Sequence, residues 1–191
     1  MDYKSVSMPI IKKEFKDMSP TEAENYFNWY VSEIKQRIAL LQNYILHEGI
    51  NIELNYTPES LISLWGWYED KIAIVEKTEE ELEQEILKYP SWMHEEISKT
   101  KISYDTLKYS WDVALYFAEV MIKNSQGKIK WGYFIKPKKR VSVNEPVLLG
   151  FKGDIDLNPR LIVMTCTRRS SRNREVKRLY DIYNTWLEYI N

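Results

Sequence analysis

The segment Ser103–Cys166 most constrains the fold, because the spacing of its apolar residues changes from a helical to a strand period near Gly127. Ser103–Asn124 is the most apolar helix candidate in the chain, with Ser103 as its cap. Three strand candidates follow it directly: Lys128–Lys136, Pro146–Phe151 and Arg160–Cys166. We therefore predict a core helix that lies on a small, mainly antiparallel sheet of three to four strands.

Helices are expected on both sides of this segment. Ser19-Pro20-Thr21-Glu22 forms a capping box with proline at the first helical position, so a long helix should run from there to about His47. Start signals and apolar spacing predict further helical segments at about 60–69, behind the capping box at 78–81, within 91–102, and at about 172–190. Because helices precede strands rather than alternate with them, the predicted fold class is α+β with a C-terminal helix.

The 191 residues are expected to form a single α+β domain, 1–191, with a sizeable core. Cys166 is the only cysteine, so an internal disulfide is impossible, which fits a reducing compartment. The N-terminus lacks the apolar run of a signal peptide, and no stretch has the length of apolar sequence that spans a membrane. The expectation is a cytoplasmic protein with no membrane partner.

Charge divides the domain into two parts. Residues 1–127, mostly helical, contain 13 Lys/Arg and 22 Asp/Glu, a net charge of −9. Residues 128–191, the predicted sheet and last helix, contain 14 Lys/Arg and 6 Asp/Glu, a net charge of +8. Two regions of opposite net charge either steer charged partners or neutralise each other where they pack together.

The usual catalytic and cofactor motifs are not found. His47, His94 and Cys166 are the only soft metal ligands and are far apart in sequence, so no metal site is expected. The six glycines are scattered and form no phosphate loop, and no nucleophile elbow occurs. Cys166 ends an apolar run, which favours a buried, inert thiol. We expect no cofactor.

One polar stripe on the predicted core helix is a weak catalytic candidate. Asp112, Tyr116 and Glu119 follow one another at helical spacing, between Lys108 and Lys123. Two carboxylates and a tyrosine could perform acid–base chemistry or bind a divalent ion. The alternative is a boundary stripe that makes Lys–Asp and Glu–Lys pairs along the helix.

Two basic loops and two tryptophans are the candidate binding residues. The loop cations are Lys138, Lys139, Arg140, Arg168, Arg169 and Arg172, and Trp131 lies in a neighbouring predicted strand. These groups could contact phosphates while aromatic rings stack on bases, or contact an acidic protein, or simply be solvated. Trp65 and Trp67 cannot share one helix face, so either both pack in the core or one, for which Trp67 is the candidate, anchors an interface.

The chain also resembles a known family. The segments SPTEAENYFNWY (19–30), WDVALYFAEVMI (111–122), IKWGYF (129–134), EPVLLGF (145–151) and LNPR (157–160) are similar to a family of small uncharacterised proteins from low-GC Gram-positive bacteria. Some small acidic and aromatic proteins of this kind are regarded as immunity partners of secreted toxins. The resemblance implies a protein partner and supplies no catalytic residues.

Two classes of function follow from these features. The first is a protein-binding module, an immunity or antitoxin-like protein that neutralises a partner by covering its active surface. The alternative is a nucleic-acid-acting enzyme or nucleic-acid-binding protein that uses the Asp112/Tyr116/Glu119 stripe and the basic loops. An enzyme would require those three side chains to converge in an open cleft.

Overall fold

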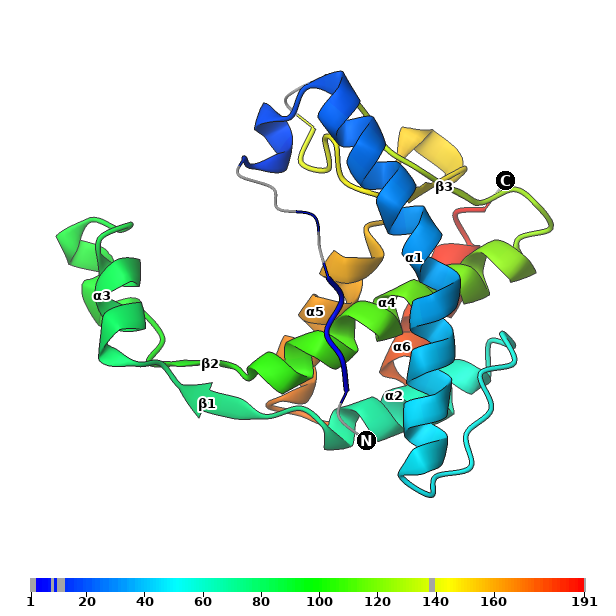
Figure 1. The fold of residues 1–191 in the computed structure, drawn as a ribbon, viewed down its shortest axis with the longest axis horizontal. Coiled ribbons are helices and arrows are strands. Elements are labelled where there is room, and N and C mark those ends of the chain that lie inside the picture. The colour runs from blue at the N-terminus through cyan, green and yellow to red at the C-terminus, as the bar shows by residue number, and fades with distance from the viewer. Residues whose placement is uncertain (1–2, 8, 10–12, 138–139, 191) are drawn as a thin grey trace.

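Helix α4 (Tyr104–Asn124) lies at the centre of the computed structural model, which describes residues 3–7, 9, 13–137 and 140–190. Three helices pack against α4: α1 (Pro20–His47), α2 (Ser60–Asp70) and α5 (Pro159–Ser170). The C-terminal helix α6 (Arg178–Leu187) packs on α2 and α5 (Figure 1). The α+β class and the C-terminal helix are confirmed, although the body is built mainly of helices.

The two longest helices begin where their capping residues predict. At the start of α1, the amide of Glu22 donates to Ser19 Oγ over 3.3 Å and the amide of Ser19 donates to Glu22 Oε2 over 2.7 Å. Ser103 Oγ likewise accepts from the amide of Thr106 at the start of α4. These side chains satisfy amides that the first turn of a helix leaves without partners.

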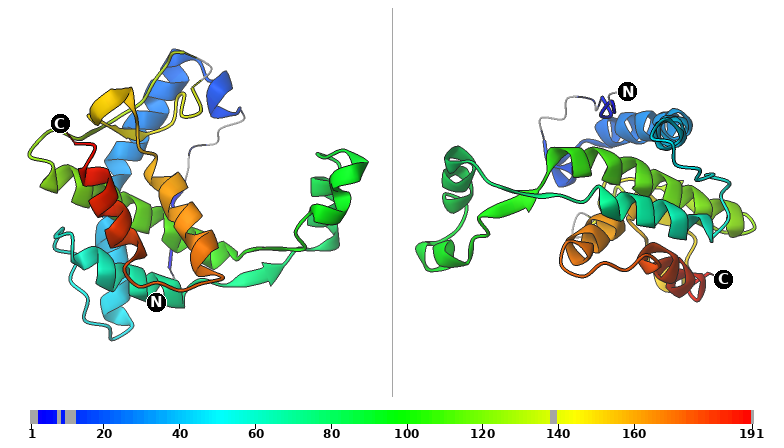
Figure 2. Two further views of the ribbon diagram at one scale, coloured as in Figure 1. Left: turned by 180° about the vertical axis from the view of Figure 1, so that it is seen from behind. Right: turned by 90° about the horizontal axis from the view of Figure 1, so that it is seen from below.

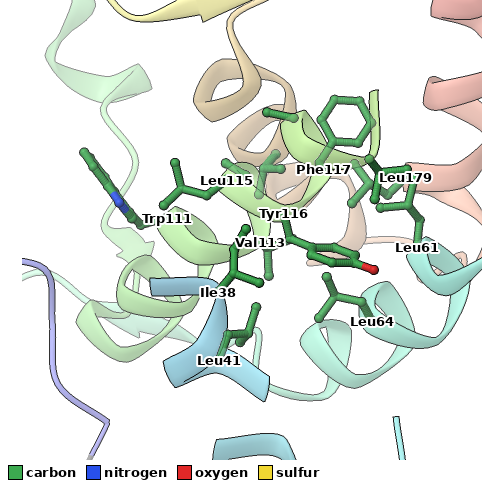
Figure 3. Packing of buried hydrophobic residues seen from close by; sticks show 14 of the residues in the cluster. Ile38, Leu41, Leu61, Leu64, Trp111, Val113, Leu115, Tyr116, Phe117 and Leu179 are labelled. Atoms are coloured by element: carbon green, nitrogen blue, oxygen red, sulfur yellow. The ribbon is translucent and has the colours of Figure 1, made fainter. Parts of the chain in front are cut away.

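The core surrounds α4 rather than lying on one side of it. Side chains of α4 from Tyr109 to Ala118 are buried without a break. Figure 3 shows the residues that meet there from four helices: Ile38, Leu41, Leu61, Leu64, Val113, Tyr116, Phe117 and Leu179. A helix that is apolar on nearly all sides is stable only when other elements cover it, which explains the central position of α4.

The sheet is smaller than predicted. In the described part of the chain, β3 (Lys130–Gly132) pairs antiparallel with β4 (Val147–Leu149), with Trp131 opposite Leu148. A second two-stranded sheet, β1 (Ile74–Glu76) with β2 (Thr100–Ile102), lies elsewhere in the fold. The expected three- to four-stranded sheet beneath the core helix is therefore corrected to two separate pairs of short strands.

The strand predicted at Arg160–Cys166 is helix α5. Its apolar residues form a short continuous run, a pattern that a buried strand and a buried helix share. The start signals decide for the helix: Asn158 Oδ1 accepts from the amide of Leu161 over 3.2 Å, and Pro159 occupies the first helical position. As a helix, the segment replaces the missing strand as the cover of α4.

An arm, residues 74–102, projects from the body (Figures 1 and 2). Strands β1 and β2 form its stem, and α3 (Glu79–Ile86) with the 3₁₀ helix Ser91–Glu96 forms its end. The sequence predicted one helical turn or more within 91–102, and the structure has a 3₁₀ helix at Ser91–Glu96, followed by strand β2. Along the described ranges, no helix is both long and apolar enough to cross a membrane.

Candidate functional site

Asp112, the first residue of the predicted catalytic stripe, is fully buried in an ion pair with α1. Arg37 Nε donates to Asp112 Oδ1 over 2.8 Å and Arg37 Nη2 to Asp112 Oδ2 over 2.5 Å. The Tyr3 hydroxyl also donates to Asp112, and Arg37 Nη1 donates to the carbonyl of Lys4 over 2.9 Å. Burial raises the pKa of Asp112, while the Arg37 guanidinium and the Tyr3 hydroxyl act against that shift. These contacts bind the N-terminal segment to α1 and α4.

Tyr116 and Glu119 serve different contacts. The Tyr116 hydroxyl is buried, accepts from the amide of Tyr56 over 2.8 Å and lies 2.6 Å from Ser60 Oγ. Glu119 Oε1 accepts from Trp131 Nε1 over 2.9 Å. Each of the three stripe residues thus joins α4 to different neighbours: Asp112 to α1 and the N-terminal segment, Tyr116 to the start of α2, and Glu119 to strand β3. The structure gives the stripe a packing role and does not bring its three side chains to a common partner.

The two candidate tryptophans also have partners within the protein. Trp67 is 5% exposed, donates to Glu48 Oε2 over 2.8 Å and packs against Tyr44 and Tyr109. Trp65 is fully buried, so both tryptophans of α2 pack in the core. Trp131 is half-buried between Glu119 and the ring of Tyr30. Trp67 therefore contributes packing rather than a surface for a partner.

The two basic loops differ in how their charges are used. Arg140 donates to Asp156 Oδ1 from Nε over 2.9 Å and from Nη2 over 2.6 Å, and its guanidinium lies over the ring of Phe134. Lys138 and Lys139 lie outside the described residues. Arg168, Arg169 and Arg172, in contrast, are exposed and line one hollow of about 490 Å³. The second predicted loop, 168–174, is corrected: Arg168 and Arg169 lie in the last turn of α5, and the loop begins only after Ser170. These two arginines and Arg172 keep their charge at the surface, whereas Arg140 joins the first loop to the turn at Asp156.

The arm exposes large apolar side chains that the sequence patterns did not single out. No residue from 74 to 102 is buried, and Leu87 and Trp92 are 78% and 75% exposed. Tyr89 is 43% exposed between them in sequence. Large apolar side chains are costly to leave in water unless a partner covers them. A signal was present in the sequence, because the segment LKYPSWM joins aromatic residues to the turn-forming Pro90.

Local contacts hold the end of the arm in shape without a core. Thr78 and Glu81 form the predicted capping box of α3. Lys77 Nζ lies 2.5 Å from Glu85 Oε2 and donates to the carbonyl of Ser98 over 2.6 Å, while Lys101 pairs with Glu81. These contacts connect the two sides of the arm to each other and leave its large apolar side chains facing solvent.

The arm is acidic. Residues 74–102 contain eight glutamates and four lysines, a net charge of −4. Lys77–Glu85 and Lys101–Glu81 are the ion pairs within the described arm. The end of the arm therefore exposes carboxylates as well as apolar side chains, at Glu79, Glu80, Glu83, Glu95 and Glu96.

Within the described ranges, no group of three or more His, Cys, Asp or Glu residues is placed to hold a metal ion. Cys166 is buried, and this burial raises the pKa of its thiol. Comparison of the chain with known proteins found no matching family model, no matching curated protein and no matching solved structure.

Proposed function

We propose that the protein is a protein-binding module that engages a partner protein through the end of the arm. The observation that carries this proposal is the exposure of Leu87 and Trp92, 78% and 75%, on an element that projects from the body. Interface anchors are typically aromatic side chains at the centre of a patch with a polar rim. Trp92 is an exposed aromatic side chain of this kind, with Leu87, Tyr89 and several glutamates near it in sequence.

The charge of the arm specifies the partner further. A net charge of −4 over 29 residues favours a partner whose contact surface is rich in Lys and Arg. Complementary charge would accelerate association, and burial of the apolar side chains would supply most of the affinity. The partner of this proposal is therefore a protein with a basic surface around an apolar pocket.

Binding by a projecting arm suits inhibition by occlusion, because an arm can enter a concave surface that the body cannot reach. This mode is that of an immunity or antitoxin-like protein, the activity implied by the family resemblance. The cytoplasm is the proposed site of action, and the single, buried Cys166 is compatible with it. An enzymatic role has less support, because Asp112 is ion-paired with Arg37 and the Tyr116 hydroxyl is hydrogen-bonded to Ser60 and to the amide of Tyr56.

The proposal can be tested by capture of the partner from cells of the source organism with the full-length protein. The wild type should retain one protein at about equimolar amount. Trp92→Ala and Leu87→Ala should each weaken its capture at least tenfold, because hot-spot truncations cost about 2 kcal/mol or more. Leu46→Ala is the matched control, since Leu46 is 49% exposed on α1 and outside the arm. Equal capture by all four proteins, or capture of no stoichiometric partner, would refute the proposal.

A further inference from the structure

A separate surface feature lies at the C-terminal end of α5. Its hollow of about 490 Å³ is lined by six polar side chains: Thr165, Arg168, Arg169, Arg172, Asn173 and Arg178. The cores of protein interfaces are largely apolar, so this lining does not resemble one. It presents guanidinium, hydroxyl and amide groups, which are the groups that contact phosphate oxygens.

The arginines of this hollow differ in their partners. Arg178 is held in place by Ser170 Oγ at 3.1 Å, the carbonyl of Asn173 at 2.8 Å and Glu175 at 3.3 Å. Arg174, in the same loop, pairs with Asp70 and does not line the hollow. Among the described residues, no carboxylate lies within ion-pair distance of Arg168, Arg169 or Arg172. Three guanidinium groups are therefore available to a ligand.

A second cavity adjoins the hollow along α5. Arg168 also lines a neighbouring cavity of about 690 Å³, whose lining includes Arg160, Phe15 and Trp186. Arg160 and Arg168 are eight residues apart on one helix, about 12 Å along its axis. Both carboxylates of this cavity have partners: Asp156 is held by Arg140, and Glu145 Oε2 accepts from Asn158 over 2.7 Å. The track along α5 thus has Arg168 at one end and Arg160, whose guanidinium lies over the ring of Trp111, at the other, with Leu161, Ile162 and Met164 lining the cavity between them.

We propose that this track, from the hollow at Arg168, Arg169 and Arg172 towards Arg160, binds the phosphate backbone of single-stranded nucleic acid. A guanidinium group can donate two parallel hydrogen bonds to the oxygens of one phosphate. Several arginines along one groove can therefore bind successive phosphates of a nucleic-acid strand, whatever its base sequence. Aromatic side chains beside such a groove can stack on bases of any kind. The site is independent of the arm, so it can exist whether or not the arm binds a protein.

The test is fluorescence anisotropy of a labelled single-stranded dodecanucleotide with the full-length protein. Three phosphate contacts predict that log affinity falls with log salt at a slope of about −2, about 20-fold between 50 and 200 mM salt. Arg168→Gln/Arg169→Gln/Arg172→Gln should weaken binding at least tenfold at 50 mM salt and bring the slope close to zero. Arg174→Gln is the matched control and should change affinity less than twofold, because Arg174 is paired with Asp70 outside the hollow. Trp92→Ala should leave binding unchanged, which separates this proposal from that of the arm.

Three results would overturn the assignment. One is the absence of binding at 50 mM salt by a wild type whose far-ultraviolet circular dichroism shows it folded. A second is an equal loss of affinity in Arg174→Gln and in the triple variant, which would show that the effect depends only on the net charge of the protein. The third is displacement of the oligonucleotide by a polyglutamate peptide at the same charge concentration, which would identify the hollow as a site for acidic protein segments.

Discussion

Arg37 of α1 and Asp112 of α4 form a bidentate ion pair in the interior, with Nε–Oδ1 and Nη2–Oδ2 distances of 2.8 and 2.5 Å. The side chain of Asp112 is inaccessible to solvent and that of Arg37 is 6% exposed. The hydroxyl of Tyr3, in the N-terminal segment, donates a further hydrogen bond to Asp112. The pair joins the two longest helices and the start of the chain at one point. Its loss should therefore lower the stability of the whole fold.

Breaking this pair should be more costly than replacing it. Arg37→Met leaves a buried carboxylate without its counter-charge and should lower the free energy of unfolding by about 3–5 kcal/mol. Arg37→Met/Asp112→Leu removes both charges and should cost less than Arg37→Met alone. Urea denaturation measures the stability of both variants. Lys16→Met, at the exposed Lys16–Glu14 pair, is the control and should leave the urea midpoint almost unchanged. A double variant less stable than the single variant would contradict this account.

Gly150 separates β4 from the turn that leads to α5, and only glycine fits there. Its φ is +114°, and a Cβ atom would lie 2.0 Å from the carbonyl oxygen of Lys128. Gly150→Ala should therefore cost several kcal/mol, because backbone must move to relieve the clash. Gly49→Ala is the control: φ there is +78° with no atom within 4 Å, so about 1 kcal/mol is expected from the backbone alone. Thermal melts that show equal losses of stability for the two variants would argue against the close approach of Gly150 to the backbone of Lys128.

Much of the helical framework could be predicted from sequence, because its signals are local. Ser19, Glu22 and Pro20 determined the start of α1, and the structure ends that helix at His47 as predicted. The core helix likewise begins after Ser103 and ends at Asn124, as predicted. The apolar spacing on α4 also indicated a core position, since Trp111 and Leu115 are buried there.

The remaining features depend on contacts that no short pattern records. The run from Leu161 to Cys166 fits strand and helix equally, and the cap at Asn158 decides between them. The arm went unrecognised because strands of three residues carry almost no periodicity. Asp112 and Glu119 were candidates by helical spacing, but their partners, Arg37 and Trp131, come from 75 residues before and 12 residues after.

Glu48 predicts a pH dependence of stability. Partial burial raises the pKa of this carboxyl, but the hydrogen bonds from Lys71 and Trp67 lower it by more, so its pKa lies below its ordinary value. The folded chain therefore binds this proton less tightly than the unfolded chain. The stabilisation is full above the ordinary glutamate pKa and is lost as the pH falls through the folded pKa.

Glu48→Gln tests this dependence. Since the side chains of Glu48 and Lys71 are 22% and 27% exposed, the variant should cost no more than about 1 kcal/mol at pH 7. The cost should shrink as the pH is lowered towards the folded pKa, measured as the difference in urea midpoint between variant and wild type. Glu53→Gln, at an exposed position with no ion pair among the described residues, should show no such change. A cost that stays constant with pH would contradict the assigned role of the Glu48 carboxylate.

The central claim, that the end of the arm contacts a partner protein, is tested most directly by site-specific photocrosslinking in cells of the source organism. Trp92→p-benzoylphenylalanine places the crosslinker at the proposed anchor, and the same substitution at Leu46 places it on the body at α1. We predict one discrete adduct of the protein with a single other protein from position 92 and none from position 46. Adduct formation from position 46 alone, or from neither position, would contradict the account.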